Sequence, residues 1–316
     1  MASSLKLEKE AFFFPIENGL YEVKAGLNKF VSGQDKVFLI DENYEEYIQA
    51  KQEALQESRG KYYCSLNELS LQDQKVLLNY FLDKLREEYP LFFEFQYEKE
   101  SLFFENKILN QKYQFPISEN KIDFGPFSDF FDFISSQVQC DLALHFVDLK
   151  NQKEHLERIH LCFPNHWSAE GKIGKSFLDI HAPVPHFDSI AKRKWQILGA
   201  MLSKGPFVRF AWGLSTDQRL NHHPLHPKKI KAEEWAGRSF QPENPKLFLR
   251  VERQVLIPFE AQKTSAFSIR TFHYDVTTLS ELQKQDLASA IRSMSEASFK
   301  YKGLVNDQEK ILKFLK

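Results

Sequence analysis

The stretches KLFLRVERQVLIPF, from Lys246 to Phe259, and SAFSIRTFHYDV, from Ser265 to Val276, decide the fold of this chain. Both are rich in β-branched, aromatic and leucine side chains, which is typical of strands. GPFVRFAWGL from Gly205 shows the same character. CDLALHFVDL from Cys140 and LERIHLCF from Leu156 are separated by a turn and indicate a hairpin. The centre of the chain therefore predicts an antiparallel sheet.

Helical patterns flank these strands on both sides. Ser70 and Asp73 form the start of an amphipathic helix whose apolar stripe includes Leu77 and Phe81 and which ends at Pro90. The chain lacks a regular alternation of strands and helices and has no GxGxxG motif, which argues against a nucleotide-binding parallel sheet. The predicted class is α+β, with a central antiparallel sheet and flanking helices. Further helices are expected at Glu42–Ser58, from Pro126, at Asn165–His181, Ser189–Ser203, Leu279–Met294 and Asp307–Leu315, and further strands from Leu91 and Ser101.

Composition excludes several classes of protein. The chain has 316 residues, of which 42% are hydrophobic, and a net charge of −1, so no basic field attracts nucleic acid or acidic membranes. Its three cysteines form no CxxC pair, which argues against structural zinc and iron–sulfur clusters and fits a reducing compartment. Neither a signal segment nor a run of about 18 apolar residues is found. We expect one large domain in the cytoplasm.

The segment LCFPNHWSAEGKIGKSFLDIHAPVP, from Leu161 to Pro185, contains the first candidate site. His181 ends the expected helix and is followed by a stiff turn with two prolines. Ile173, Phe177 and His181 are spaced at i, i+4 and i+8, which predicts one helix face. Such an imidazole suits a haem iron, although a histidine on an apolar face is more often a hydrogen-bonded core residue.

Arginines inside apolar strands form the second candidate site. Arg209, Arg250, Arg253 and Arg270 each lie in a predicted strand, where a buried guanidinium requires a carboxylate or a ligand. Alternation places Arg250 and Glu252 on one face of their strand and Arg253 on the other. One interpretation is an exposed face with Arg–Glu pairs; the other is contact with haem propionates, oxygen or a cationic substrate.

Other residues remain as alternatives. His222, His223 and His226 are closely spaced in a polar loop, and His222 or His223 is the main rival of His181 as an iron ligand. Cys162 could supply a thiolate, but its neighbours Leu161 and Phe163 favour buried packing.

An ordered series of motifs resembles the alpha subunit of haem-dependent oxidative N-demethylase. The motifs are LCFPNHW, GKIGKSFLDIHAPVP, VRFAWGLSTDQRLNHHP, LRVERQVL and FSIRTF, and they end at Tyr301-Lys302-Gly303. They span roughly Asp141 to Gly303, about half the chain. The resemblance implies a PAS-like sheet that binds haem b, with His181 as the proximal iron ligand. Ala211 stands where the family has Asn, and Val255 stands where it has Thr.

The resemblance also implies an activity and partners. The expected reaction is a monooxygenase-type oxidation of a small alkylamine such as dimethylamine, which releases formaldehyde and uses oxygen and electrons from a separate flavin or iron–sulfur reductase. Arg209, Arg250 and Glu252 are the expected catalytic residues, with Arg209 or Arg250 polarising oxygen. Ile173, Phe177, Arg253, Arg270 and Trp212 are expected to contact the cofactor. A PAS-like haem sensor of gas or redox state is the alternative.

Within a single domain of residues 1–316, we expect an N-terminal helical and irregular segment (residues 1–139), a family-matching core (residues 140–303) and a C-terminal helix (residues 304–316).

Overall fold

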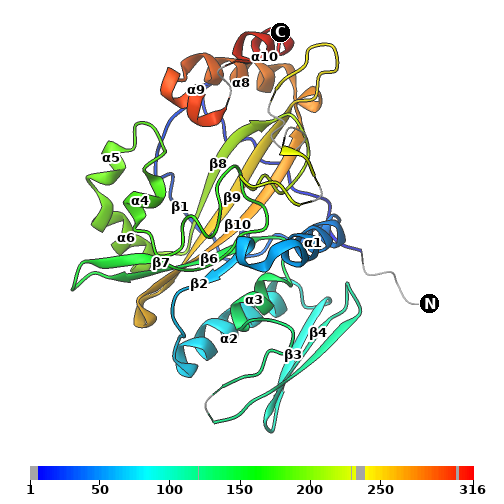
Figure 1. Ribbon diagram of the computed structural model, residues 1–316, viewed down its shortest axis with the longest axis vertical. Helices are drawn as coiled ribbons and strands as arrows, with labels where there is room; N and C mark the ends of the chain where they lie inside the picture. Colours follow the sequence, from blue (N-terminus) through cyan, green and yellow to red (C-terminus); the bar gives the residue numbers. More distant parts are fainter. Residues whose placement is uncertain (1–5, 120, 229, 233–238, 304–305) are drawn as a thin grey trace.

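The computed structural model describes residues 6–119, 121–228, 230–232, 239–303 and 306–316. It is an α+β structure with a large antiparallel sheet and a smaller one (Figure 1). The fold class predicted from the sequence is thus confirmed. In spatial order the seven strands of the large sheet are β1 (Asn28–Lys29), β8 (Phe207–Ser215), β9 (Phe248–Phe259), β10 (Thr264–Asp275), β6 (Asp141–Asp148), β7 (Lys153–His160) and β2 (Tyr63–Ser65).

The long pair β9 and β10 is the centre of the large sheet. Its two strands are in register from Phe248↔Asp275 to Phe259↔Thr264, and a short turn joins them at Glu260–Gln262. β6 and β7 form the second hairpin, as the sequence predicts. Residues paired directly across antiparallel strands share a face of the sheet. Arg209, Gln254 and Ile269 form one such row, so side chains distant in sequence reach the same face.

Apart from α1, the helices lie in three groups around the two sheets. Figure 1 shows α4, α5 and α6 on one side of the large sheet, α8–α10 near the C-terminus, and α2 and α3 beside the small sheet. The bounds are α1 (Tyr44–Tyr62), α2 (Leu71–Glu88), α3 (Phe130–Ser135), α4 (Phe177–His181), α5 (Asp188–Ala191), α6 (Lys194–Ser203), α8 (Glu281–Ser293), α9 (Glu296–Lys302) and α10 (Gln308–Phe314). The small sheet consists of β3 (Phe93–Glu98), β4 (Ser101–Asn106) and β5 (Gln111–Pro116).

Helix α2 shows how local sequence produces these elements. The Ser70 hydroxyl accepts a hydrogen bond from the Asp73 backbone N–H, which satisfies one of the free donors of the first turn. Its predicted apolar stripe, including Leu77 and Phe81, is fully buried in a core shared with α1, α3 and the small sheet. None of the helices in the described part of the chain is long and apolar enough to cross a membrane.

Two predicted helices differ from the structure. The helix expected at Asn165–His181 is reduced to the five residues of α4, because His166 and Gly174 have φ angles of 62° and 75° that interrupt a right-handed helix. Ile173 therefore does not share a helix face with Phe177 and His181. The helix expected at Ser189–Ser203 is divided into α5 and α6. Strand β5 and helix α9 were not predicted from the sequence.

Candidate functional site

A cavity of about 1160 Å³ lies against one face of the large sheet. Its floor includes Arg209, Glu252 and Leu256 of the central strands, and α4 contributes Phe177 and His181. The opposite wall comes from both ends of the chain, namely residues 12–28 and the end of α9. Small-molecule and cofactor sites commonly occupy about 300–1000 Å³. The cavity is therefore large enough for a sizeable cofactor.

His181 is held in one orientation by its own helix. Its Nδ1 lies 2.7 Å from the backbone carbonyl oxygen of Phe177. A carbonyl oxygen can only accept, so Nδ1 carries the proton and Nε2 retains a lone pair. The imidazole also stacks on Phe187, with ring centroids 4.8 Å apart and an interplanar angle of 2°. The described contacts thus fix both the tautomer and the plane of the ring.

The electrostatic surroundings keep His181 neutral. Burial, assisted by the nearby positive charge of Arg209, lowers the pKa of His181 to about 4, against the opposing hydrogen bond to Phe177. A neutral imidazole with a free lone pair is the form that binds iron or another transition metal.

Arg209 is the second notable group in the cavity wall. Its Nε atom is buried and has no hydrogen-bond partner among the described residues. Burial lowers the pKa of the guanidinium, although Glu252 partly offsets this effect. A buried Nε–H group without a partner is unfavourable, so the position of Arg209 favours an anionic or hydrogen-bond-accepting ligand.

Glu252 supplies a carboxylate to the same wall. It lies next to Ala211 across the β8–β9 pair. Its Oε2 accepts a hydrogen bond of 3.2 Å from Gln254, and its Oε1 lies 3.9 Å from Arg250 Nε. At 3.9 Å from Arg250 the ion pair is loose, which leaves the carboxylate able to attract a cationic ligand.

Apolar side chains form most of the remaining wall. Phe177, Phe187, Leu256 and Phe267 contribute rings or branched chains, and Trp212 lines the side nearest α9. The Trp212 carbonyl accepts a hydrogen bond from the Lys302 ammonium group. These surfaces suit a flat aromatic cofactor.

The structure does not bring four of the predicted residues to the cavity. Arg250 lies on the same face of β9 as Glu252, but its guanidinium donates to the carbonyls of Phe163 at 2.7 Å and Leu220 at 3.2 Å. Arg253 lies on the opposite face, where it donates to the Lys36 carbonyl at 2.9 Å.

Arg270 also lies on that opposite face. It pairs with Asp41 at 2.7 Å and covers the Tyr47 ring, with the guanidinium carbon 3.8 Å from the ring centroid. Ile173 is displaced for a different reason: it precedes α4 and packs on the apolar cluster around Ala143 and Leu161. Alternation along a strand separates faces correctly, but it does not show which face bears a cavity.

The alternative iron ligands lie elsewhere. His222 Nε2 lies 2.8 Å from Asp217, and His223 Nε2 lies 3.2 Å from Glu170, and neither histidine lines the cavity. Burial lowers the pKa of His222, which Asp217 partly offsets. Both side chains therefore have carboxylate partners outside the cavity.

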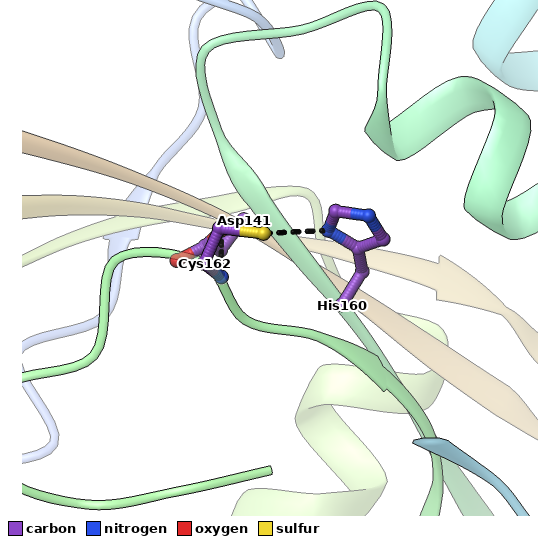
Figure 2. A group of neighbouring side chains, drawn as sticks. All are labelled: Asp141, His160 and Cys162. Atoms are coloured by element: carbon purple, nitrogen blue, oxygen red, sulfur yellow. Dashed lines mark hydrogen bonds between the residues drawn. The ribbon is translucent and has the colours of Figure 1, made fainter. Parts of the chain in front are cut away.

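Cys162 belongs to a buried group with Asp141 and His160, whose possible ligand atoms lie within 4.8 Å of one another (Figure 2). The two Asp141 oxygens already accept the backbone N–H groups of Cys162 and Phe163, each at 2.8 Å. The Lys51 ammonium lies 3.8 Å from Asp141, where it opposes a metal cation. Burial raises the pKa of the Cys162 thiol well above its usual range. We therefore infer that this group stabilises the turn after β7 and does not bind a metal.

Two features of the cavity were missed from the sequence. His145 of β6 lines it and is hydrogen-bonded to Glu154, and residues 12–28 form a wall. Ala143 and His145 are two positions apart on β6, so alternation could have predicted that they share a face. For residues 12–28, no periodic pattern could have done so.

Comparison with known proteins identifies the family of this chain. No curated protein matches the chain. A family model described as haem-dependent oxidative N-demethylase, alpha subunit-like, matches residues 29–312, which reaches further toward the N-terminus than the motifs recognised in the sequence. The match covers most of the chain, and the chain therefore belongs to the haem-dependent oxidative N-demethylase, alpha subunit-like family.

Proposed function

We propose that this protein binds haem b in the cavity, with His181 Nε2 as the iron ligand, and oxidatively removes a methyl group from a small alkylamine. One observation carries the proposal: a neutral imidazole, fixed through Nδ1, lies in the same cavity wall as a buried guanidinium whose Nε has no partner among the described residues.

The residues present fit a haem group in three respects. The apolar wall of Phe177, Phe187 and Leu256 accommodates a flat macrocycle, and the cavity volume of about 1160 Å³ is sufficient. His181 offers the ligand nitrogen that haem iron requires. Arg209 offers a positive charge to a propionate or to oxygen. We assign no role at the haem to Arg250, Arg253 and Arg270, because their guanidinium groups donate hydrogen bonds to residues outside the cavity.

Glu252 is the proposed binding group for the amine. A small alkylamine is protonated at neutral pH, and a carboxylate in a partly buried wall attracts it and orients its methyl group. When bound, haem supplies the activation of oxygen and accepts electrons. The overall reaction consumes one oxygen molecule, two electrons and two protons, and it gives the demethylated amine, formaldehyde and water. Arg209 stabilises negative charge that develops on oxygen.

The electrons are proposed to come from a separate reductase, because the sequence contains no flavin, nicotinamide or iron–sulfur motif. The family description as an alpha subunit supports a system of several components. We propose a cytoplasmic location, which the free thiols of Cys64, Cys140 and Cys162 support.

A second candidate function is a haem-binding sensor without turnover. Ala211 favours it, because this residue lies in the cavity wall and cannot supply the polar contact of the family's Asn. Val255 does not bear on the question, since it is fully buried in the core and does not line the cavity.

The test is the absorption spectrum of protein reconstituted with haem. We expect a Soret band that is lost or strongly shifted in His181→Ala and retained in His222→Ala. An unchanged spectrum in His181→Ala would overturn the ligand assignment. Formaldehyde release from dimethylamine, with oxygen and a chemical reductant, then separates the demethylase from the sensor.

A further inference from the structure

Glu154 of β7 is a buried carboxylate that connects three elements around the cavity. Its Oε2 accepts hydrogen bonds from the Phe177 backbone N–H and from His145 Nε2, each at 2.7 Å. Its Oε1 lies 2.6 Å from the Lys194 ammonium. The side chain is 1% exposed. One residue of β7 thus contacts α4, β6 and α6.

The contact with Phe177 leads directly to His181. Phe177 is the first residue of α4: its N–H donates to Glu154, and its carbonyl accepts from His181 Nδ1. The rings of Phe177 and His181 are also in contact, with centroids 4.5 Å apart. Only two hydrogen bonds therefore separate the Glu154 carboxylate from the imidazole.

Helix α4 cannot hold this position by itself. It has five residues, far fewer than the roughly 12–15 that an isolated helix needs for marginal stability. Its first turn is held by the Ser176 cap and by Glu154. The direction of His181 consequently depends on contacts made by the rest of the protein with α4.

The charge on Glu154 strengthens these contacts. Burial alone raises its pKa, but hydrogen bonds from His145, Lys194 and the Phe177 N–H outweigh this effect and leave the pKa below its usual value. Glu154 is therefore ionised at neutral pH. A negative charge is favourable at the N-terminal end of α4, and hydrogen bonds to an ionised acceptor are the stronger ones.

We propose that Glu154 is the positioning residue of the iron ligand. It holds α4 through Phe177, so that His181 Nε2 is directed into the cavity, and it fixes His145 as a second imidazole in the same wall. This inference rests on the proposed function, since it assigns the ligand role to His181. Outer partners of metal ligands typically contribute about 10–100-fold to metal affinity.

The experiment compares Glu154→Ala, Glu154→Gln and the control Glu157→Gln. Glu157 lies on the same strand, is 5% exposed and also pairs with a histidine, at 2.6 Å from His155, but it has no hydrogen bond to α4 in the described structure. Haem affinity is measured by titration, and the iron–histidine stretching frequency is measured by resonance Raman spectroscopy on the reduced protein. The ¹⁵N chemical shifts of His181 are recorded on the haem-free protein.

We expect Glu154→Ala to weaken haem binding about 10–100-fold, to lower or broaden the iron–histidine stretch and to shift the His181 ¹⁵N signals. Glu154→Gln keeps an acceptor oxygen for Phe177 and should recover most of the affinity. Glu157→Gln should match the parent protein in all three measurements.

Two results would overturn the inference: Glu154→Ala with the parent stretching frequency and ¹⁵N shifts, or Glu157→Gln with the same changes as Glu154→Ala. If Glu154→Ala does not fold, Glu154→Gln is compared with Glu157→Gln, since both are isosteric changes on one strand: loss of the Glu154 charge should still shift the His181 ¹⁵N signals, Glu157→Gln should leave them unchanged, and equal shifts in both variants would overturn the inference. If the parent protein binds no haem, the proposed function fails, and the ¹⁵N shifts of the haem-free variants still decide whether Glu154 positions His181.

Discussion

The Nδ1 atom of His181 and the carbonyl oxygen of Phe177, one turn earlier in the same short helix, are 2.7 Å apart. This contact commits Nδ1 to the proton and leaves Nε2 as the only ring nitrogen with a lone pair. Burial lowers the pKa of this imidazole to about 4 although the hydrogen bond to Phe177 opposes the shift, so His181 stays neutral well below the pH at which a histidine usually titrates.

The neutral buried histidines should make the protein sensitive to acid. Burial lowers the pKa values of His181 and His160 to about 4, whereas an unfolded histidine titrates near about 6.5. Between these values the unfolded state binds more protons, so the stability present above about pH 6.5 is lost as the pH falls toward 4.

Each group accounts for up to about 3 kcal/mol of the free energy of unfolding. Urea denaturation at pH 7 and pH 5 should show the decrease, and His181→Asn should show a smaller one. An equal decrease in His181→Asn would argue against the lowered pKa.

Arg209→Met should stabilise the haem-free protein. The substitution removes a buried guanidinium whose Nε has no partner among the described residues, and the expected gain in the free energy of unfolding is about 1–3 kcal/mol. The comparison is Arg270→Met, which leaves Asp41 unpaired and should lose about 3–5 kcal/mol. Chemical denaturation of both variants provides the measurement, and a loss of stability in Arg209→Met would contradict the prediction.

Glu252→Gln should weaken binding of a cationic amine while leaving haem in place. Replacing a carboxylate by an amide removes the attraction to the ammonium group, and we expect KM for dimethylamine to rise about tenfold, equivalent to about 1.4 kcal/mol. The Soret band should be unchanged. A neutral substrate analogue provides the control, because its affinity should not change; a KM unaffected by the substitution would remove Glu252 from the amine site.

Gly174→Ala should destabilise the turn that leads into α4. Gly174 has a φ of +75°, a conformation that costs an alanine about 1–2 kcal/mol. Gly60 in α1 is the matched control, because a Cβ added there meets no atom within 4 Å and Gly60→Ala should instead gain up to about 1 kcal/mol. Thermal denaturation of the two variants should show opposite signs; the same sign in both would be inconsistent with strain at Gly174.

The central strands could be predicted from the sequence because their signal is local. β8, β9 and β10 are each rich in aromatic, β-branched and leucine side chains, and alternation placed Arg250 with Glu252 and opposite Arg253. The amphipathic stripe and Ser70 cap of α2 were equally local.

The features that could not be predicted depend on contacts distant in sequence. Whether a strand arginine faces the cavity depends on what covers each face of the sheet. On the face opposite the cavity, Arg270 donates a hydrogen bond to Asp41, and Arg253 donates one to the Lys36 carbonyl. The segment from Asn165 to His181 has apolar residues at helical spacing, but His166 and Gly174 adopt positive φ angles that interrupt a helix, and the spacing does not indicate this. The role of Glu154 requires α4 and α6 to be in place, because no pattern within β7 indicates its partners.

The wall of the cavity includes Phe13 near one end of the chain and Lys302 near the other. During synthesis on the ribosome, an emerging chain therefore has no complete cavity until nearly all 316 residues have been translated. A truncated product that lacks α9 would accordingly present His181 in an incomplete pocket.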